Sequence, residues 1–186
     1  WNLQTIEGEF HRCHSKNQLI YHSKSDSCTP RPWAQFEKQV LLGDEPHIII
    51  DFRGILYMVF VEGFSSGTGI SEAISFDDGS TWKITENVIP NGIHPTIAIG
   101  TEGMIIEAAY VQGIIQARRR FAGEDWSGVF TFTDTTGAAI QAQSTTFHLT
   151  NAYEPASRWV LSMVVKLETS VSEWESFDDC QTWRRI

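Results

Sequence analysis

Residues 75–82 read SFDDGSTW, and residues 176–183 read SFDDCQTW. The two stretches carry Ser, Asp, Thr and Trp at the same relative positions, and Cys180 stands in the second where Gly79 stands in the first. A repeated motif has to be established before anything else, because a unit that recurs at a fixed period defines the whole architecture. We therefore expect an array of similar units, each carrying one such stretch.

Two further patterns recur with a similar spacing. Residues 46–50 (PHIII) and 95–99 (PTIAI) are each followed by a glycine and then by an apolar stretch, 55–61 or 104–111. Four tryptophans also recur about once per 50 residues, close to the roughly 40 to 50 residues of a four-stranded propeller blade: Trp33, Trp82, Trp126 and Trp183. The agreement between the patterns predicts a β-propeller.

Within one unit the sequence reads as antiparallel strands. Residues 48–51 and 56–61 are rich in β-branched side chains, while 70–76 and 81–88 flank turn residues typical of a hairpin. No stretch has the period of an amphipathic helix. We predict an all-β fold, a single propeller domain over residues 1–186. It would hold about four blades of four strands, approximately residues 1–45, 46–94, 95–144 and 145–186.

Composition and charge exclude several classes of protein. Of 186 residues, 41% are apolar and 20% charged, as in an ordinary globular domain with a core. The net charge is −9, whereas a nucleic-acid-binding domain normally carries a basic face. The one basic run, residues 118–120, is interpreted as solvated charge on an outer strand. No apolar run approaches the ~18 residues of a membrane-spanning helix. We expect neither nucleic-acid binding nor membrane insertion.

Metal and cofactor binding are not predicted. An odd number of cysteines leaves at least one thiol free. Histidines and cysteines near the start of the chain are ligand types that zinc accepts, but their spacing matches no standard zinc pattern. The residues concerned are His11, Cys13, His14, His22 and Cys28, with Cys180 as the third cysteine.

The chemistry of the repeated motif is structural. Its Asp can accept hydrogen bonds from backbone N–H groups in a tight turn, its Gly tolerates a positive φ, and its Trp is expected to pack into the blade. A weaker copy keeps Trp126 without the Ser and the first Asp. We predict structural roles for seven residues: Ser75, Asp77, Gly79, Trp82, Ser176, Asp178 and Trp183.

On these residues the motif resembles the Asp box of sialidases and related BNR-repeat propellers. In that family the box lies on the peripheral turn between the third and fourth strands of a blade, away from the catalytic centre. The resemblance therefore implies the fold and does not imply an activity.

The catalytic groups of that family are not matched. Sialidases use a tyrosine nucleophile paired with a carboxylate, an Asp acid/base, and three arginines that hold the substrate carboxylate. The family's first arginine lies in an Arg-Ile-Pro segment, whereas Arg31 lies between two prolines and is interpreted as a turn residue. Tyr57 is expected in the core, and beside Tyr153, which precedes Glu154, no second carboxylate can be assigned. The family's enzymes need about six blades. We predict no catalytic residue.

Topology suggests where a ligand would bind. If strands run outward in each blade, the loops at the end opposite the box turns surround the mouth of the central channel, and loops on a rigid scaffold commonly carry function. An aromatic on such a loop can stack on a sugar or a partner. The candidate binding residues are His47, Phe64, Ser65, Asn91 and His94. The alternative for both histidines is that they only cap strand ends.

The first functional hypothesis is a non-catalytic propeller that binds other protein subunits in a larger assembly, such as a bacteriophage virion or tail component or a surface protein. Because the chain begins with Trp1, we expect a processed product or part of a longer chain. The alternatives are a lectin for cell-surface glycan and a fragment of a sialidase-type glycoside hydrolase. The expected location is extracellular or virion-associated.

Overall fold

The computed structural model describes residues 2–4, 10–25, 38–62, 69–100, 103–121, 124–142, 148–153, 159–166 and 169–186. Every named element within these ranges is a β-strand. Among the same residues, no helix has the length and hydropathy that crossing a membrane requires.

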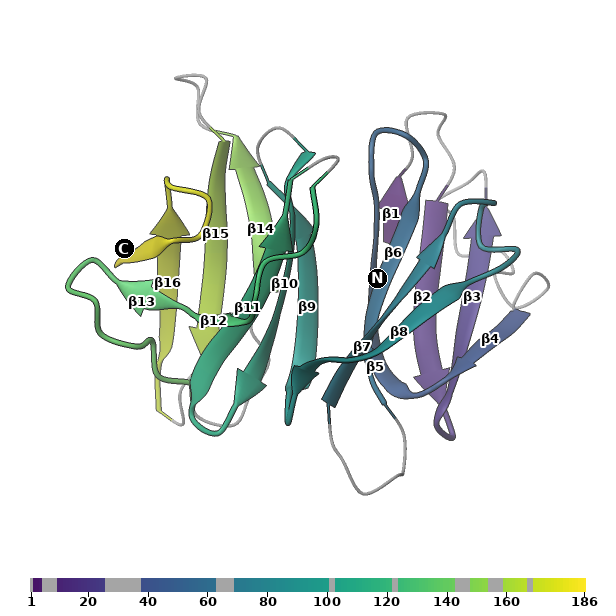
Figure 1. Cartoon of the computed structure of the whole chain (residues 1–186), viewed down its shortest axis with the longest axis horizontal. Helices are drawn as coiled ribbons and strands as arrows, with labels where there is room; N and C mark the ends of the chain where they lie inside the picture. The colour runs from purple at the N-terminus through teal and green to yellow at the C-terminus, as the bar shows by residue number, and fades with distance from the viewer. Residues whose placement is uncertain are drawn as a thin grey trace. The chain divides into compact units, whose positions relative to one another are not determined.

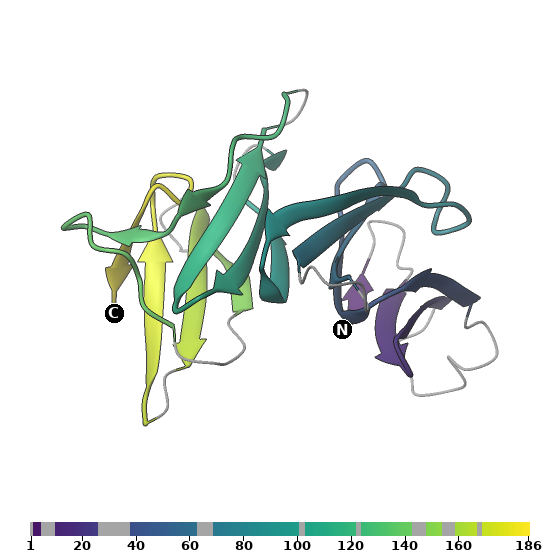
Figure 2. The same cartoon turned by 60° about the horizontal axis from the view of Figure 1, so that its bottom comes forward.

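The first of two compact units, Trp1–Pro90, holds two four-stranded antiparallel sheets (Figures 1 and 2). In both sheets the spatial order of the strands is their order in the chain. One sheet contains β1 (Asn2–Gln4), β2 (Phe10–Lys16), β3 (Leu19–Ser25) and β4 (Lys38–Leu42). The other contains β5 (Asp44–Ile50), β6 (Leu56–Val61), β7 (Gly69–Ser75) and β8 (Lys83–Pro90).

The second unit, Asn91–Ile186, holds the other two sheets of the described residues. One contains β9 (Ile93–Ile99), β10 (Ile105–Val111), β11 (Ile114–Arg120) and β12 (Phe130–Thr131). The other contains β13 (Thr133–Asp134), β14 (His148–Tyr153), β15 (Trp159–Lys166), β16 (Val171–Ser176) and β17 (Thr182–Arg185).

Strand β13 departs from the simple order. It precedes β14 in the chain but pairs in parallel with β17, at the far edge of that sheet. The short segment from β12 to β13 therefore belongs to both sheets of the second unit. Its central residue, Phe132, is fully buried, and its ring centroid lies 4.8 Å from that of Trp183. The sequence patterns did not predict this strand.

Each unit has its own apolar core. In β6, residues 56–60 are all buried, as expected for a strand covered on both faces, where apolar residues run on instead of alternating. The first core includes Ile20, Ile48 and Met58, and the second includes Ile106, Met163 and Trp183. The prediction of an all-β chain built from antiparallel sheets is confirmed. The single domain and the blade limits stay predictions.

The interpretation of residues 118–120 as solvated charge is wrong for Arg118. This side chain is buried on β11, its Nε donates to Glu107 Oε2 at 2.6 Å, and its guanidinium lies 4.0 Å from the ring centroid of Trp126. Glu107 is on β10, directly opposite Arg118 in the ladder. A buried arginine needs such a carboxylate, because an uncompensated buried charge is strongly destabilising.

We expect Arg118→Leu to lower the free energy of unfolding by about 3–5 kcal/mol, since it leaves the buried Glu107 carboxylate without its guanidinium partner. Arg184→Leu is the matched control, because Arg184 pairs with Glu175 at 3.1 Å but its side chain is 61% exposed. An exposed pair should cost less than about 1 kcal/mol. Urea unfolding measures both, and equal losses would contradict the prediction.

Candidate functional site

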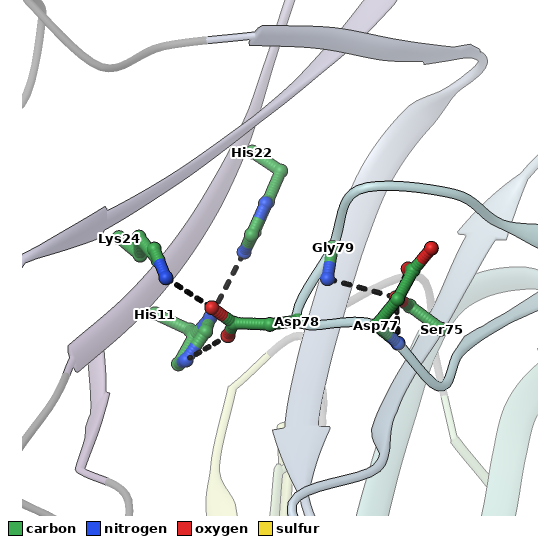
Figure 3. A network of polar contacts seen from close by, with 7 residues as sticks. All are labelled: His11, His22, Lys24, Ser75, Asp77, Asp78 and Gly79. Carbon is green, nitrogen blue, oxygen red and sulfur yellow. Dashed lines mark hydrogen bonds and ion pairs between the residues drawn. The ribbon is translucent and has the colours of Figure 1, made fainter.

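The first repeat turn, residues 75–82, joins β7 to β8 and is built on two side chains. The Ser75 hydroxyl accepts the N–H of Gly79 at 2.8 Å and donates to Asp77 Oδ1 at 2.9 Å (Figure 3). The Asp77 carboxylate accepts hydrogen bonds from the Thr81 N–H at 2.8 Å and from the Thr81 hydroxyl at 2.6 Å. These bonds from Thr81 are the main cause that lowers the pKa of Asp77.

The second repeat turn, residues 176–183, joins β16 to β17 with the same bonds. Ser176 accepts the N–H of Cys180 and donates to Asp178, both at 2.9 Å. Asp178 accepts from the N–H and the hydroxyl of Thr182 at 2.9 and 2.6 Å. Both turns hold two consecutive residues at positive φ, namely Asp78 and Gly79 in the first and Asp179 and Cys180 in the second.

The corresponding turn between β11 and β12 lacks these residues and is held differently. Ser127 donates its N–H to the Arg119 carbonyl at 2.8 Å and accepts the Arg119 N–H on its hydroxyl at 3.0 Å. The guanidinium groups of Arg118 and Arg120 lie 4.0 and 4.8 Å from the Trp126 ring centroid. This turn is thus held by Ser127 and by cation–π contacts, without the carboxylate that the repeat turns use.

In the first unit, Asp78 extends from the first repeat turn to the sheet β1–β4 (Figure 3). Its Oδ1 lies 3.4 Å from Nε2 of His11 on β2, and its Oδ2 accepts from Lys24 on β3. His11 Nδ1 in turn lies 3.0 Å from Nε2 of His22 on β3, with the ring centroids 5.2 Å apart and the ring planes 13° apart. We call His11, His22, Lys24, Asp78 and Gly79 the histidine joint.

Gly79 is required at the histidine joint for two reasons. Its φ is +79°, a conformation that costs a residue with a Cβ roughly 1–2 kcal/mol. A Cβ at this position would also lie 2.3 Å from Cε1 of His22. Trp82, at the end of the turn, makes an edge-to-face contact with the same imidazole, 5.7 Å between centroids.

The second unit builds the same contact from different residues. The strands β10 and β11 of the second unit correspond to β2 and β3 of the first. The pair of opposite residues Ile106 and Arg119 takes the place of His11 and Lys24. Two residues before Arg119, Ala117 takes the place of His22. Arg119 donates to the backbone carbonyl of Asp179. Cys180, Ala117 and Ile106 lie in one buried cluster. A small side chain, Ala117, therefore stands at the position of His22 where the turn carries Cys180 in place of Gly79. We call Ile106, Ala117, Arg119, Asp179 and Cys180 the apolar joint.

The predicted binding residues lie in three places. His47 is half-buried on β5, Asn91 is exposed between β8 and β9, and His94 is half-buried on β9. Phe64 and Ser65 lie outside the described residues, as do Arg31 and Cys28 and the side chain of Tyr153. By strand direction, the beginnings of β5 and β9 lie at the ends of their sheets opposite the turns that follow β7 and β11.

The beginnings of β5 and β9 share a feature that the sequence patterns did not reveal. Glu45 and His94, each directly before a proline, have φ of 50° and 53°, and the strand register shifts at both places. A non-glycine residue with positive φ is uncommon, and such strain, of order 1–3 kcal/mol, clusters at binding sites. We call residues 44–47 and 93–96 the proline bulges. When the two prolines are aligned, His94 corresponds to Glu45 and His47 corresponds to Thr96.

Tyr57 is in the core, as predicted, with 1% of its surface exposed. Its hydroxyl lies 3.4 Å from Asp51 Oδ2 and accepts from Arg53 at 3.2 Å. Asp51 also accepts the backbone N–H groups of Arg53 and Ile55 at 2.9 and 3.0 Å. This tyrosine–carboxylate pair orders the turn after β5, and burial prevents a substrate from reaching the hydroxyl.

The described residues contain no group of three or more His, Cys, Asp or Glu side chains that could hold a metal ion. Cys13 and Cys180 are free, buried thiols. Burial raises the pKa of Cys13 to about 12.

No family model and no curated protein matches the sequence. Among solved structures, a fucose lectin from Kordia zhangzhouensis in complex with methyl-fucoside aligns with 76% of this chain and 96% of its own, at 14% identity and a TM-score of 0.50. A Hadza microbial sialidase (14% identity, TM-score 0.62) and the alpha-L-arabinofuranosidase of Fusarium graminearum with arabinobiose (15%, 0.64) align with the whole chain.

These likenesses show the fold. The chain is a sialidase-like β-propeller, which confirms the predicted fold class, and about four blades agree with the four sheets of the described residues. The chain spans 45% of the length of the sialidase chain and 65% of that of the arabinofuranosidase chain.

We expect Gly79→Ala to lower the free energy of unfolding by about 2–3 kcal/mol, from backbone strain and the clash with His22. The double variant Gly79→Ala/His22→Ala should lose less than the sum of its single changes, because the clash is gone. Gly54→Ala is the matched control, since Gly54 has a φ of +81° and nothing within 4 Å of its added Cβ. If the loss of Gly79→Ala adds fully to that of His22→Ala, as the loss of Gly54→Ala is expected to do, the prediction is contradicted.

The contribution of Asp178 to stability should depend on pH. Burial raises the pKa of Asp178, but the bonds from Thr182 and Ser176 outweigh it and hold the value below the usual 3.8. Stability from this carboxylate is therefore complete above an unfolded pKa of about 4 and is lost as pH falls through the lower folded value. The difference in Tm between the native chain and Asp178→Asn, measured from pH 7 to pH 2.5, should shrink with acid. A constant difference would oppose this reading.

Proposed function

We propose that this chain is a carbohydrate-recognising part of a sialidase-like propeller and that it binds sugars without hydrolysing them. The fold itself does not establish a function. Support comes from the kinds of propeller it resembles, a fucose lectin and glycosidases, and from the proline bulges, where a strained backbone holds a polar side chain at the same position of two strands.

The chemistry of the bulges favours a neutral sugar. Asp44 and Glu45 are exposed carboxylates at the start of β5, and Asp44 already accepts the Ser15 hydroxyl and the Glu45 N–H. Carboxylates accept hydrogen bonds from sugar hydroxyls but repel an acidic sugar, as does a net charge of −9. At the second bulge, the His94 imidazole can donate or accept.

Described arginines that are already paired favour sugar binding over sialoside hydrolysis, because sialidases hold the substrate carboxylate with arginines. Three of these arginines are held by neighbours in their own units: Arg53 by Asp51 at 2.7 Å, Arg118 by Glu107, and Arg119 by the Asp179 carbonyl. None of the three lies at a proline bulge. The observation that carries the proposal is the recurrence of the bulge itself, at Glu45 and His94.

A protein-binding role in a larger assembly, extracellular or virion-associated, is the second candidate. It is favoured by two exposed phenylalanines at one end of the sheet β5–β8. Phe52, in the turn before β6, is 63% exposed, and Phe76, directly after β7, is 70% exposed. Aromatic side chains are enriched where proteins meet, and other protein subunits would be the partners.

A glycan array followed by calorimetric titration tests the carbohydrate proposal. We expect neutral glycans to bind, and Glu45→Gln to weaken binding roughly tenfold, since hydrogen bonds to charged groups contribute roughly 1.5–3 kcal/mol. His94→Asn should do likewise while tolerating the positive φ. Glu86→Gln, on the exposed face of β8, is the control that should bind normally.

Two outcomes would overturn the carbohydrate proposal. One is a folded native chain that binds no glycan, and the other is binding that the bulge variants leave intact. In the first case, cross-linking of the native chain to its neighbours in its source material, compared with Phe76→Ser, would test the protein-binding candidate.

A further inference from the structure

We infer that the hairpin β2–β3 positions the first proline bulge, so that the sheet β1–β4 is a supporting part of the sugar site at the start of β5. The inference rests on the proposed sugar binding and names the residues that fix the geometry of that site. They are Cys13, Ser15 and Gln18, which we call the hairpin brace. Each of them bonds to a different residue beside Glu45.

Ser15 reaches the strained residue through one carboxylate oxygen. The Ser15 hydroxyl donates to Asp44 Oδ1, and the same oxygen accepts the backbone N–H of Glu45 at 2.8 Å. Glu45 has a φ of 50°, and a strained backbone of this kind persists only where the surrounding structure enforces it. Ser15 therefore fixes the carboxylate that holds the Glu45 N–H.

Cys13 bonds to the residue on the other side of Glu45. Its thiol donates to the Pro46 carbonyl, with 3.5 Å between Sγ and the oxygen. Because burial raises the pKa of Cys13 to about 12, the thiol keeps its hydrogen at neutral pH and can donate it. Cys13 and Ser15 are two residues apart on β2, so both side chains lie on the same face of that strand.

Gln18, in the turn between β2 and β3, fixes the residue that precedes Asp44. Its carbonyl accepts the N–H of Gly43 at 3.0 Å. A Cβ on Gly43 would lie 2.5 Å from Cδ2 of Phe60 and 2.7 Å from the carbonyl oxygen of Val61, so a glycine lets the chain pass this close to β6. The brace therefore holds the segment 43–46 at three residues around Glu45.

The brace fixes the backbone of a site whose polar side chains face solvent. Asp44 and Glu45 are exposed, whereas the groups that hold them belong to the neighbouring sheet. Fixing a binding loop in advance raises affinity, because less freedom is lost when the ligand binds. If the bulge adopts its binding conformation only part of the time, the apparent affinity falls by the same fraction. The residues of the brace are thus positioning residues, which act on the sugar through Asp44 and Glu45.

Amide exchange of the ligand-free chain, followed by NMR, tests the brace before any sugar is added. We expect Ser15→Ala to accelerate exchange of the Glu45 N–H roughly threefold to tenfold, since the Asp44 carboxylate is then free to turn away. Ser15→Thr keeps the hydroxyl and should exchange like the native chain. Lys16→Ala, at the next position of β2 and on its other face, is the matched control. Unchanged exchange in Ser15→Ala would overturn the inference.

Calorimetric titration with the neutral glycan that binds best on the array relates the brace to recognition. Ser15→Ala should raise Kd roughly threefold to tenfold, and Ser15→Thr should restore the native value. The double variant Ser15→Ala/Glu45→Gln should lose less than the product of its single losses, because both changes act at one bulge. Ser15→Ala/His94→Asn should lose the full product. A full product in both double variants would overturn the inference.

Failure of the brace and failure of sugar binding give different results. A native chain that binds no glycan overturns the proposed function, and exchange of the Glu45 N–H then decides the brace by itself. Native glycan affinity in Ser15→Ala overturns the brace and leaves sugar binding intact. Cys13→Ala, which removes the contact with Pro46, is the second variant if Ser15→Ala fails to fold, and it should also accelerate exchange at Glu45.

Discussion

Two consecutive residues at positive φ in each repeat turn let the turn reach beyond its own sheet. In the first unit Asp78 contacts His11 and Lys24, and in the second Arg119 reaches the backbone of Asp179. The turn can hold this unusual backbone because a serine hydroxyl and a carboxylate satisfy its N–H groups from inside. The packing of sheet against sheet within a unit thus depends on hydrogen bonds made within eight residues.

The two joints are alternative solutions to the same packing problem. A glycine allows a large imidazole to approach the turn, and an alanine on the strand leaves space for a thiol on the turn. The first solution places polar, titratable rings in a buried position, where their hydrogen bonding is conditional on protonation. The second packs Ile106, Ala117 and Cys180 in a buried apolar cluster.

The two ends of the sheet β5–β8 have separate tasks. The turn after β7 carries the contacts of Asp78 with the neighbouring sheet. The starts of β5 and β9 carry backbone strain at Glu45 and His94, which the rest of each sheet must support. A scaffold that is stabilised at one end can tolerate strained, polar residues at the other, and this division suits a protein that recognises a ligand.

Local features of this protein were predictable from its sequence because they depend on neighbours in the chain. The strands follow from short runs rich in β-branched residues, and the motif at 75–82 indicated a tight turn since its Ser, Asp and Gly act on adjacent backbone. The burial of Arg118 against Glu107, the pairing of β13 with β17 and the contact of His11 with His22 were not predictable. The left-handed φ before two prolines was also hidden. Each of these depends on residues brought together by strand pairing or sheet packing, or on a strand register that no short stretch of sequence specifies.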